Sequence, residues 1–99
     1  MLISLLCFDK PRHADLRHLL RPTHLQWIEE TGVTLAFAGP MLSSDAKTAQ
    51  GSIIIGEFAS VEDAESFSKA DPYSIGGLFD RVIIQPTRQV YPSLAASAR

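Results

Sequence analysis

The sequence predicts an α+β fold. Four short apolar segments are rich in residues that favour strands, and each is bounded by glycine, proline or polar residues. Two other segments carry apolar residues at three- and four-residue spacing, which predicts a helix in each. In chain order these segments read β-α-β-β-α-β, the order of a ferredoxin-like sandwich. We therefore expect a four-stranded antiparallel sheet with two main helices on one face.

The first half of the chain predicts a strand, a helix and a second strand. MLISLLCF (1–8) is apolar and is followed by DKP, which predicts a strand and a turn, and TLAFAGPM (34–41) predicts the second strand. Pro22 lies within the helical segment and predicts either a kink or a new helix that begins there. The apolar face of this helix is formed by Leu16, Leu19, Leu20, His24, Trp27, Ile28 and Thr31.

The second half predicts two further strands around a second helix. LSSDAKTAQ (42–50) is a polar loop, and the sequence leaves open whether it closes as a lid. GSIIIGEF (51–58) and DRVIIQPTRQVY (80–91) predict strands. Ser60 and Asp63 form a capping-box-like helix start, and we expect the apolar face of that helix to contain Val61, Ala64, Phe67 and Ala70. We expect a single domain over residues 1–92 and a disordered tail over 93–99.

Composition narrows the class of protein. The chain has 99 residues, of which 45% are hydrophobic and 20% charged, with a formal net charge of -2. That balance argues against nucleic-acid binding, which needs a basic excess. No segment is long and apolar enough for a membrane span, and the N-terminus lacks the features of a signal peptide, so a cytoplasmic protein is expected. The lone Cys7 excludes an internal disulfide and fits a small buried residue on a strand.

Apolar residues fall on both faces of the predicted strands. Two helices cover only one face of a four-stranded sheet, so the other face needs a cover of its own. We therefore expect a homodimer in which the open faces of two sheets pack together. The residues behind this expectation are Leu2, Leu6 and Phe8 alternating with Ile3, Leu5 and Cys7, and the consecutive Ile53, Ile54 and Ile55.

His24 occupies a position on the apolar helix face where leucine would pack better. In the predicted topology the two helices run in opposite directions, so the start of the first lies beside the end of the second. This places His24, in the first turn after Pro22, near Asp71, which follows the second helix. A histidine held by a carboxylate is a common general acid or base. The alternatives are that His24 is a satisfied buried histidine and that Asp71 merely caps a short helix beginning at Pro72.

Other polar residues offer weaker predictions. Tyr73 either lines a pocket or only packs, and Arg17 and Arg21 either bind an anionic substrate or are solvated. His13 and His18 lie off the apolar face and are expected at the surface. The sequence contains no phosphate-binding loop, no dinucleotide motif and no paired metal-binding cysteines or histidines, so we expect no cofactor and no metal.

At these residues the sequence resembles the YciI-like (YCII-related) family. The resemblance runs from Met1 to about Tyr91, and its most specific parts are Arg-Pro-x-His-Leu and Asp-Pro-Tyr followed by a Gly-Leu-Phe segment. It implies a ferredoxin-like fold related to the dimeric α/β-barrel proteins, and an active site whose His-Asp pair falls on His24 and Asp71. A branch of the family acts as a dehydrochlorinase on chlorinated hydroxyhydroquinones, while the wider superfamily holds muconolactone isomerases and cofactor-free monooxygenases.

Two functions from different classes follow. The first is a small cofactor-independent lyase or isomerase, in which His24 transfers a proton on a small cyclic or aromatic substrate, Asp71 orients it, and Tyr73 and Arg21 position the ligand. Hydrolysis fits less well, since no activated nucleophile is evident. The second is a non-catalytic dimeric module that binds a small ligand or assists another enzyme. A purely structural His-Asp pair is the third reading.

Overall fold

The computed structural model describes residues 1–92, and it contains four strands and three helices within them. The predicted β-α-β-β-α-β order is confirmed, with one short helix added before the last strand. In chain order the elements are β1 (Leu2–Asp9), α1 (Ala14–Glu30), β2 (Leu35–Leu42), β3 (Ala49–Glu57), α2 (Val61–Ala70), α3 (Pro72–Ile75) and β4 (Phe79–Pro86).

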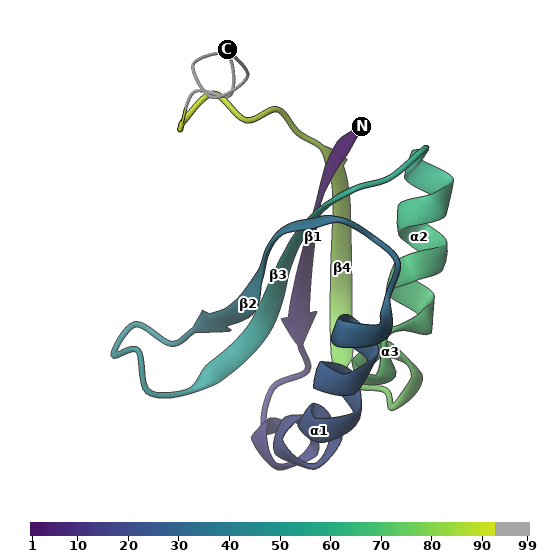
Figure 1. Cartoon of the computed structure of the whole chain (residues 1–99). Helices are drawn as coiled ribbons and strands as arrows, with labels where there is room; N and C mark the ends of the chain where they lie inside the picture. The colour runs from purple at the N-terminus through teal and green to yellow at the C-terminus, as the bar shows by residue number, and fades with distance from the viewer. Residues whose placement is uncertain (93–99) are drawn as a thin grey trace.

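The four strands form one antiparallel sheet in the order β2-β3-β1-β4 (Figure 1). β1 is a central strand, with Leu5 opposite Ile54 on one side and Ile84 on the other. Each helix connects two strands that are not adjacent in the sheet, as the ferredoxin-like fold requires. The predicted fold class is therefore confirmed.

The core lies between the helices and one face of the sheet. Alternate residues of β1 are fully buried, and Cys7 among them is 1% exposed. Burial raises the pKa of the Cys7 thiol to about 12, so this side chain is a neutral part of the core, as the sequence predicts. The buried cluster consists of Ile3, Leu5, Cys7, Ile54, Phe58, Ala64 and Phe67.

The opposite face of the sheet is apolar and only partly buried. Phe37 on β2 is 51% exposed and Ile83 on β4 is 36% exposed. Between these two residues, the strand register places half-buried residues of β1 and β3 on the same face of the sheet. We call this surface the open face, and its apolar members are Leu2, Leu6, Phe8, Phe37, Ile53, Ile55 and Ile83.

α1 differs from the prediction in two respects. It is one continuous helix of 17 residues with Pro22 inside it, so His24 lies in its interior and not in the first turn of a helix. Pro22 is exposed, and the His18 carbonyl that loses its partner can bond to water instead. The sequence predicts Leu19 on the buried face, but this side chain is 72% exposed. Arg17 occupies the buried face instead, two helical turns before His24.

Two predicted boundaries are also wrong. Leu42 pairs with Ala49, so the loop predicted at 42–50 is a shorter turn of residues 43–48. The last strand ends at Pro86 and not at Tyr91. Pro86 pairs with Ile3 near the beginning of β1, and of residues 87–92 only Thr87 still bonds to that strand, through its N–H to the Leu2 carbonyl. The predicted tail, 93–99, lies outside the described residues.

Within residues 1–92, none of the helices has the length and apolar character needed to cross a membrane.

Candidate functional site

The site begins with a hydrogen bond between α1 and the start of α3. His24 Nδ1 lies 2.9 Å from Asp71 Oδ1, although 47 positions separate the two residues in the chain. Both are buried, His24 at 9% and Asp71 at 1% exposure. The structure thus brings together the two residues that the sequence predicts as neighbours.

The two helices approach closely because Gly76 ends α3. A Cβ at Gly76 would lie 2.5 Å from Cδ1 of Leu20 on α1. With no side chain there, α3 can pack against α1 near the turn of α1 that carries His24. This contact holds Asp71 within reach of the imidazole.

Asp71 performs two functions with one oxygen. Its Oδ1 accepts a hydrogen bond from the backbone N–H of Tyr73 at 2.9 Å, which caps α3, and it is also the partner of His24. The helix-cap reading and the His-Asp pair are therefore both present. Since the cap fixes the carboxylate, it also fixes the direction from which His24 is held.

The carboxylate selects the tautomer of His24. An ionised carboxylate only accepts hydrogen bonds, so Nδ1 carries the proton and Nε2 of the neutral ring has a free lone pair. Within residues 1–92, every buried side-chain nitrogen and oxygen has a hydrogen-bond partner. His24 Nε2 has no partner in this part of the chain, so it is not one of the buried atoms. Nε2 is therefore open to the cavity that His24 lines.

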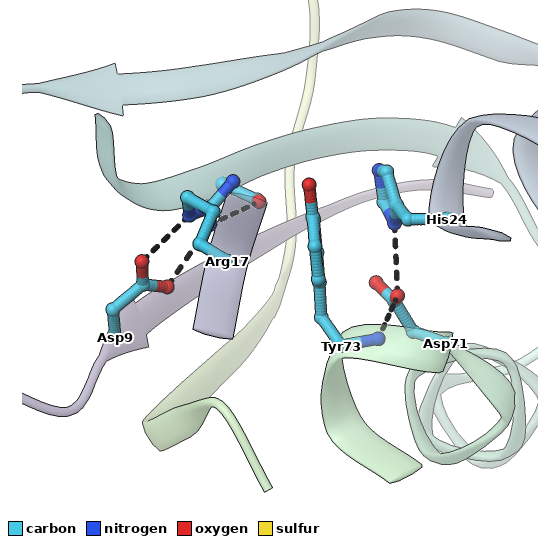
Figure 2. Close-up of polar contacts among 6 residues, drawn as sticks. Asp9, Arg17, His24, Asp71 and Tyr73 are labelled. Carbon is cyan, nitrogen blue, oxygen red and sulfur yellow. Dashed lines mark hydrogen bonds and ion pairs between the residues drawn. The ribbon is translucent and has the colours of Figure 1, made fainter. Parts of the chain in front are cut away.

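Tyr73 lies between two cationic or ionisable groups. Its ring stacks on His24 with centroids 4.1 Å apart at 15°, while Arg17 Cζ lies 4.5 Å from its centroid. Figure 2 shows the Tyr73 hydroxyl and the unbonded nitrogen of His24 on the same side, away from Asp71. Burial raises the pKa of Tyr73, against the opposing charge of Arg17, so its hydroxyl stays protonated at neutral pH and can donate a hydrogen bond.

Arg17 belongs to a buried ion pair that sequence reasoning missed. Its Nε and Nη2 donate to the two carboxylate oxygens of Asp9 at 2.6 and 2.9 Å, and Nη2 also donates to Ser52 Oγ at 2.9 Å (Figure 2). Although burial lowers the pKa of Arg17, the hydrogen bonds and charge of Asp9 raise it above its ordinary value. The pair fixes the guanidinium against Tyr73. The available signal was the spacing of seven residues between Arg17 and His24, which places them on one helix face.

A cavity of about 460 Å³ lies between α1 and the strands β2 and β3. His24 and Tyr73 belong to its polar lining, and Ile28, Ala38 and Ile54 are among its apolar lining. A volume of this size suits one small organic molecule.

Further basic residues line this cavity. Arg21 and Lys47 are both exposed and both face it, and His18 joins them. Of the residues predicted to touch a ligand, Arg21 and Tyr73 thus both line the cavity with His24. His13 lies outside it, with its Nδ1 near the carbonyl of Pro11.

Among the residues that the structure describes, no group of three histidine, cysteine or acidic side chains is placed to hold a metal ion.

The fold and the cavity define a small α+β protein with a partly polar cavity between its first helix and its sheet. The chain belongs to the family of the YCII-related domain, whose family model matches residues 1–88. Among its relatives are the proteins named YciI of Escherichia coli O6:H1 and of Shigella flexneri. Each is 33% identical over 99 residues, which covers 92% of this chain and all of the relative.

A solved structure shares the fold over most of its length. It is 5-chloro-2-hydroxyhydroquinone dehydrochlorinase (TftG) from Burkholderia phenoliruptrix AC1100, in complex with 2,5-dihydroxybenzoquinone. The TM-score is 0.82 at 28% identity, and the alignment covers 90% of this chain and 95% of the other. The predicted family resemblance is therefore confirmed.

Proposed function

We propose that this protein is a small enzyme that transfers a proton on a small cyclic or aromatic substrate, with His24 as general acid or base. The observation that carries the proposal is the bond of His24 Nδ1 to Asp71, because it directs the lone pair of Nε2 into the cavity. Proton transfer by a positioned imidazole contributes a factor of about 100 to 10,000 in rate.

The reaction class that fits best is elimination or isomerisation. In an elimination, Nε2 takes a proton from a substrate carbon or hydroxyl, the electron pair moves into the ring, and chloride leaves with the bonding electrons of the C–Cl bond. The imidazolium that forms is stabilised by the Asp71 carboxylate 2.9 Å away. In an isomerisation the same proton returns to another atom of the substrate.

Tyr73 and Arg21 have supporting roles in this proposal. The neutral Tyr73 hydroxyl donates to a substrate oxygen, and the Arg21 guanidinium offsets negative charge that builds on the substrate. Cys7 is unsuited to nucleophilic catalysis, since its buried thiol has a pKa of about 12. The structural similarity to a dehydrochlorinase supports a small-molecule substrate and makes dehydrochlorination the first reaction to test.

The test is turnover of chlorinated hydroxyhydroquinones and related ring compounds, followed by chloride release and by exchange of substrate hydrogen with deuterated water. We expect His24→Ala to lose at least about a hundredfold in kcat while it still folds and binds ligand. Asp71→Asn is expected to lose less kcat than His24→Ala, because it keeps the imidazole and its side-chain oxygen can still cap α3.

His13→Ala is the matched control, because it removes a histidine outside the cavity and should leave turnover unchanged. If the wild type binds such ring compounds but neither consumes nor exchanges any, and His24→Ala only weakens binding, the proposal fails in favour of a non-catalytic ligand-binding or accessory module. A loss of stability in His24→Ala with no effect on ligands favours a structural pair.

We propose in addition that the protein forms a homodimer through the open face. The apolar residues of that face are partly exposed in the single chain, with Phe37 half exposed at its edge. A second copy covers them with an equivalent surface, as a two-fold dimer does.

A further inference from the structure

Arg21 and Lys47 are two cations that line the cavity from different elements. Arg21 lies on α1, and Lys47 lies in the turn between β2 and β3. Neither forms an ion pair within residues 1–92. The ion pairs in this part of the chain are formed by Met1, Arg17 and His24. Their charges are therefore available to a ligand.

Two other basic side chains of the cavity wall already have acidic partners. Arg17 is paired with Asp9, and His24 is held by Asp71. Neither carboxylate lines the cavity, and no other acidic side chain among residues 1–92 does. The chain as a whole has a formal net charge of -2, so this positive lining is a local feature that favours an anion.

The turn that carries Lys47 is fixed by its own hydrogen bonds. Ser43 and Thr48 pair through the backbone at 2.8 Å, and Asp45 Oδ1 accepts from Ser43 Oγ at 2.6 Å and from the Lys47 N–H at 3.1 Å. The hydrogen bonds from Ser43 and then from Lys47 lower the pKa of Asp45, so its carboxylate stays ionised and keeps this turn closed. Lys47 is thus presented on a preorganised backbone, which limits the entropy lost when it meets a ligand.

The rest of the cavity fits a ring. The side chains of Ile28 and Ile54 are apolar, while the Tyr73 hydroxyl and His24 Nε2 offer polar contacts to ring substituents. A cavity of about 460 Å³ accommodates one such ring with short substituents.

We propose that Arg21 and Lys47 determine specificity for small ring compounds that carry an anionic group, such as a carboxylate or an ionised phenol. The anionic group lies between the two cations, and the ring lies against the apolar lining. This inference rests on the proposed function in that both use the same cavity, but it concerns binding and not proton transfer.

The test is an NMR titration of the wild type with matched pairs of an anion and its neutral isostere, namely benzoate with benzamide and salicylate with salicylamide. We expect the anions to bind more tightly, with shifts at cavity residues, and their advantage to shrink as salt is raised. Arg21→Gln and Lys47→Gln should each weaken anion binding about fivefold, the effect of one partly exposed charge pair. Both variants should weaken binding of the amides much less, because an amide carries no charge for Arg21 or Lys47 to pair with.

Arg88→Gln and Lys69→Gln are the matched controls, because each removes the same type of charge from an exposed position outside the cavity. They should leave both affinities unchanged. Equal affinity for acid and amide, an anion preference that survives both cavity variants, or no cavity shift with any of the four compounds at tens of millimolar would overturn the proposal. His24→Ala separates it from the proposed function, since it should lower kcat at least about a hundredfold but keep the preference for anions.

Discussion

At the scale of single residues, the candidate site depends on the orientation of one carboxylate. Asp71 Oδ1 joins the backbone of Tyr73 to the ring of His24, so the short helix α3 and the imidazole are held by the same atom. Tyr73 then stacks on the ring that Asp71 orients. Because these contacts share one oxygen, removing the charge of Asp71 tests the pair without removing the helix cap.

Asp71→Asn should therefore change the hydrogen bond of His24 more than the fold. The carboxylate accepts a charge-assisted hydrogen bond from Nδ1–H, and the neutral amide of asparagine accepts a weaker one. In NMR the Nδ1–H proton resonance should therefore move upfield in the variant. Asp80→Asn is the control, since Asp80 is an exposed residue on β4 and should not alter this resonance. An unchanged Nδ1–H resonance in Asp71→Asn would show that the carboxylate charge does not act on His24.

The sequence was informative about some of these residues and silent about others. His24 and Asp71 could be placed together because one interrupts an apolar face and the other follows the end of a helix. The seven-residue spacing places Arg17 on the same helix face as His24, but its burial could not be predicted. That burial depends on Asp9 and Ser52, which come from two different strands. A charged residue on a helix predicts solvent exposure unless its partners are known, and here those partners are known only from the fold.

At the scale of elements, the strands and helices followed from local patterns, but their ends did not. The type and order of the four strands and two main helices were predicted from apolar spacing. The end of β4 depends on where β1 begins, and the shortening of the 42–50 loop depends on the pairing of Leu42 with Ala49. α1 continues through Pro22 because packing of its buried face outweighs the loss of one hydrogen bond.

The buried face of β1 gives a prediction about alkaline pH. The pKa of Cys7 is raised from 9.0 to about 12 in the folded chain, so the folded state holds the proton more tightly than the unfolded state. The stabilisation that results is complete below pH 9.0 and is lost as pH rises towards about 12. Between pH 8 and 10.5, Cys7 ionisation should lower the free energy of unfolding by roughly 2 kcal/mol.

Urea unfolding of the wild type and of Cys7→Ala at these two pH values measures this effect. Tyr73 and the other ionisable groups contribute equally to both proteins, so the difference in pH dependence isolates the thiol. We expect Cys7→Ala to be less stable at pH 8 but to lose less stability as pH rises. Parallel losses in the two proteins would mean that the Cys7 thiol is not desolvated in the folded state.

At the scale of the whole molecule, the open face is the largest feature that a single chain leaves unexplained. A sheet covered by helices on one side alone is expected to have polar residues on the other side, yet β1, β3 and β4 present apolar residues there. The cavity lies on the helix-covered side, so a second copy on the open face leaves access to His24 unobstructed. The proposed dimer therefore stabilises the sheet without entering the site.

A charge at the centre of the open face should separate the two copies. Ile53 lies on β3 opposite Leu6, so Ile53→Lys would bury an ammonium group in the proposed interface, and that costs more than a dimer contact can offset. Sedimentation equilibrium should show a dimer for the wild type and a folded monomer for Ile53→Lys. Leu19→Lys is the control, because Leu19 is 72% exposed on α1, outside the open face. The Leu19→Lys protein should remain dimeric. A wild type that is monomeric at all concentrations, or an Ile53→Lys protein that stays dimeric, would contradict this assembly, and the apolar residues of the open face would then need another partner.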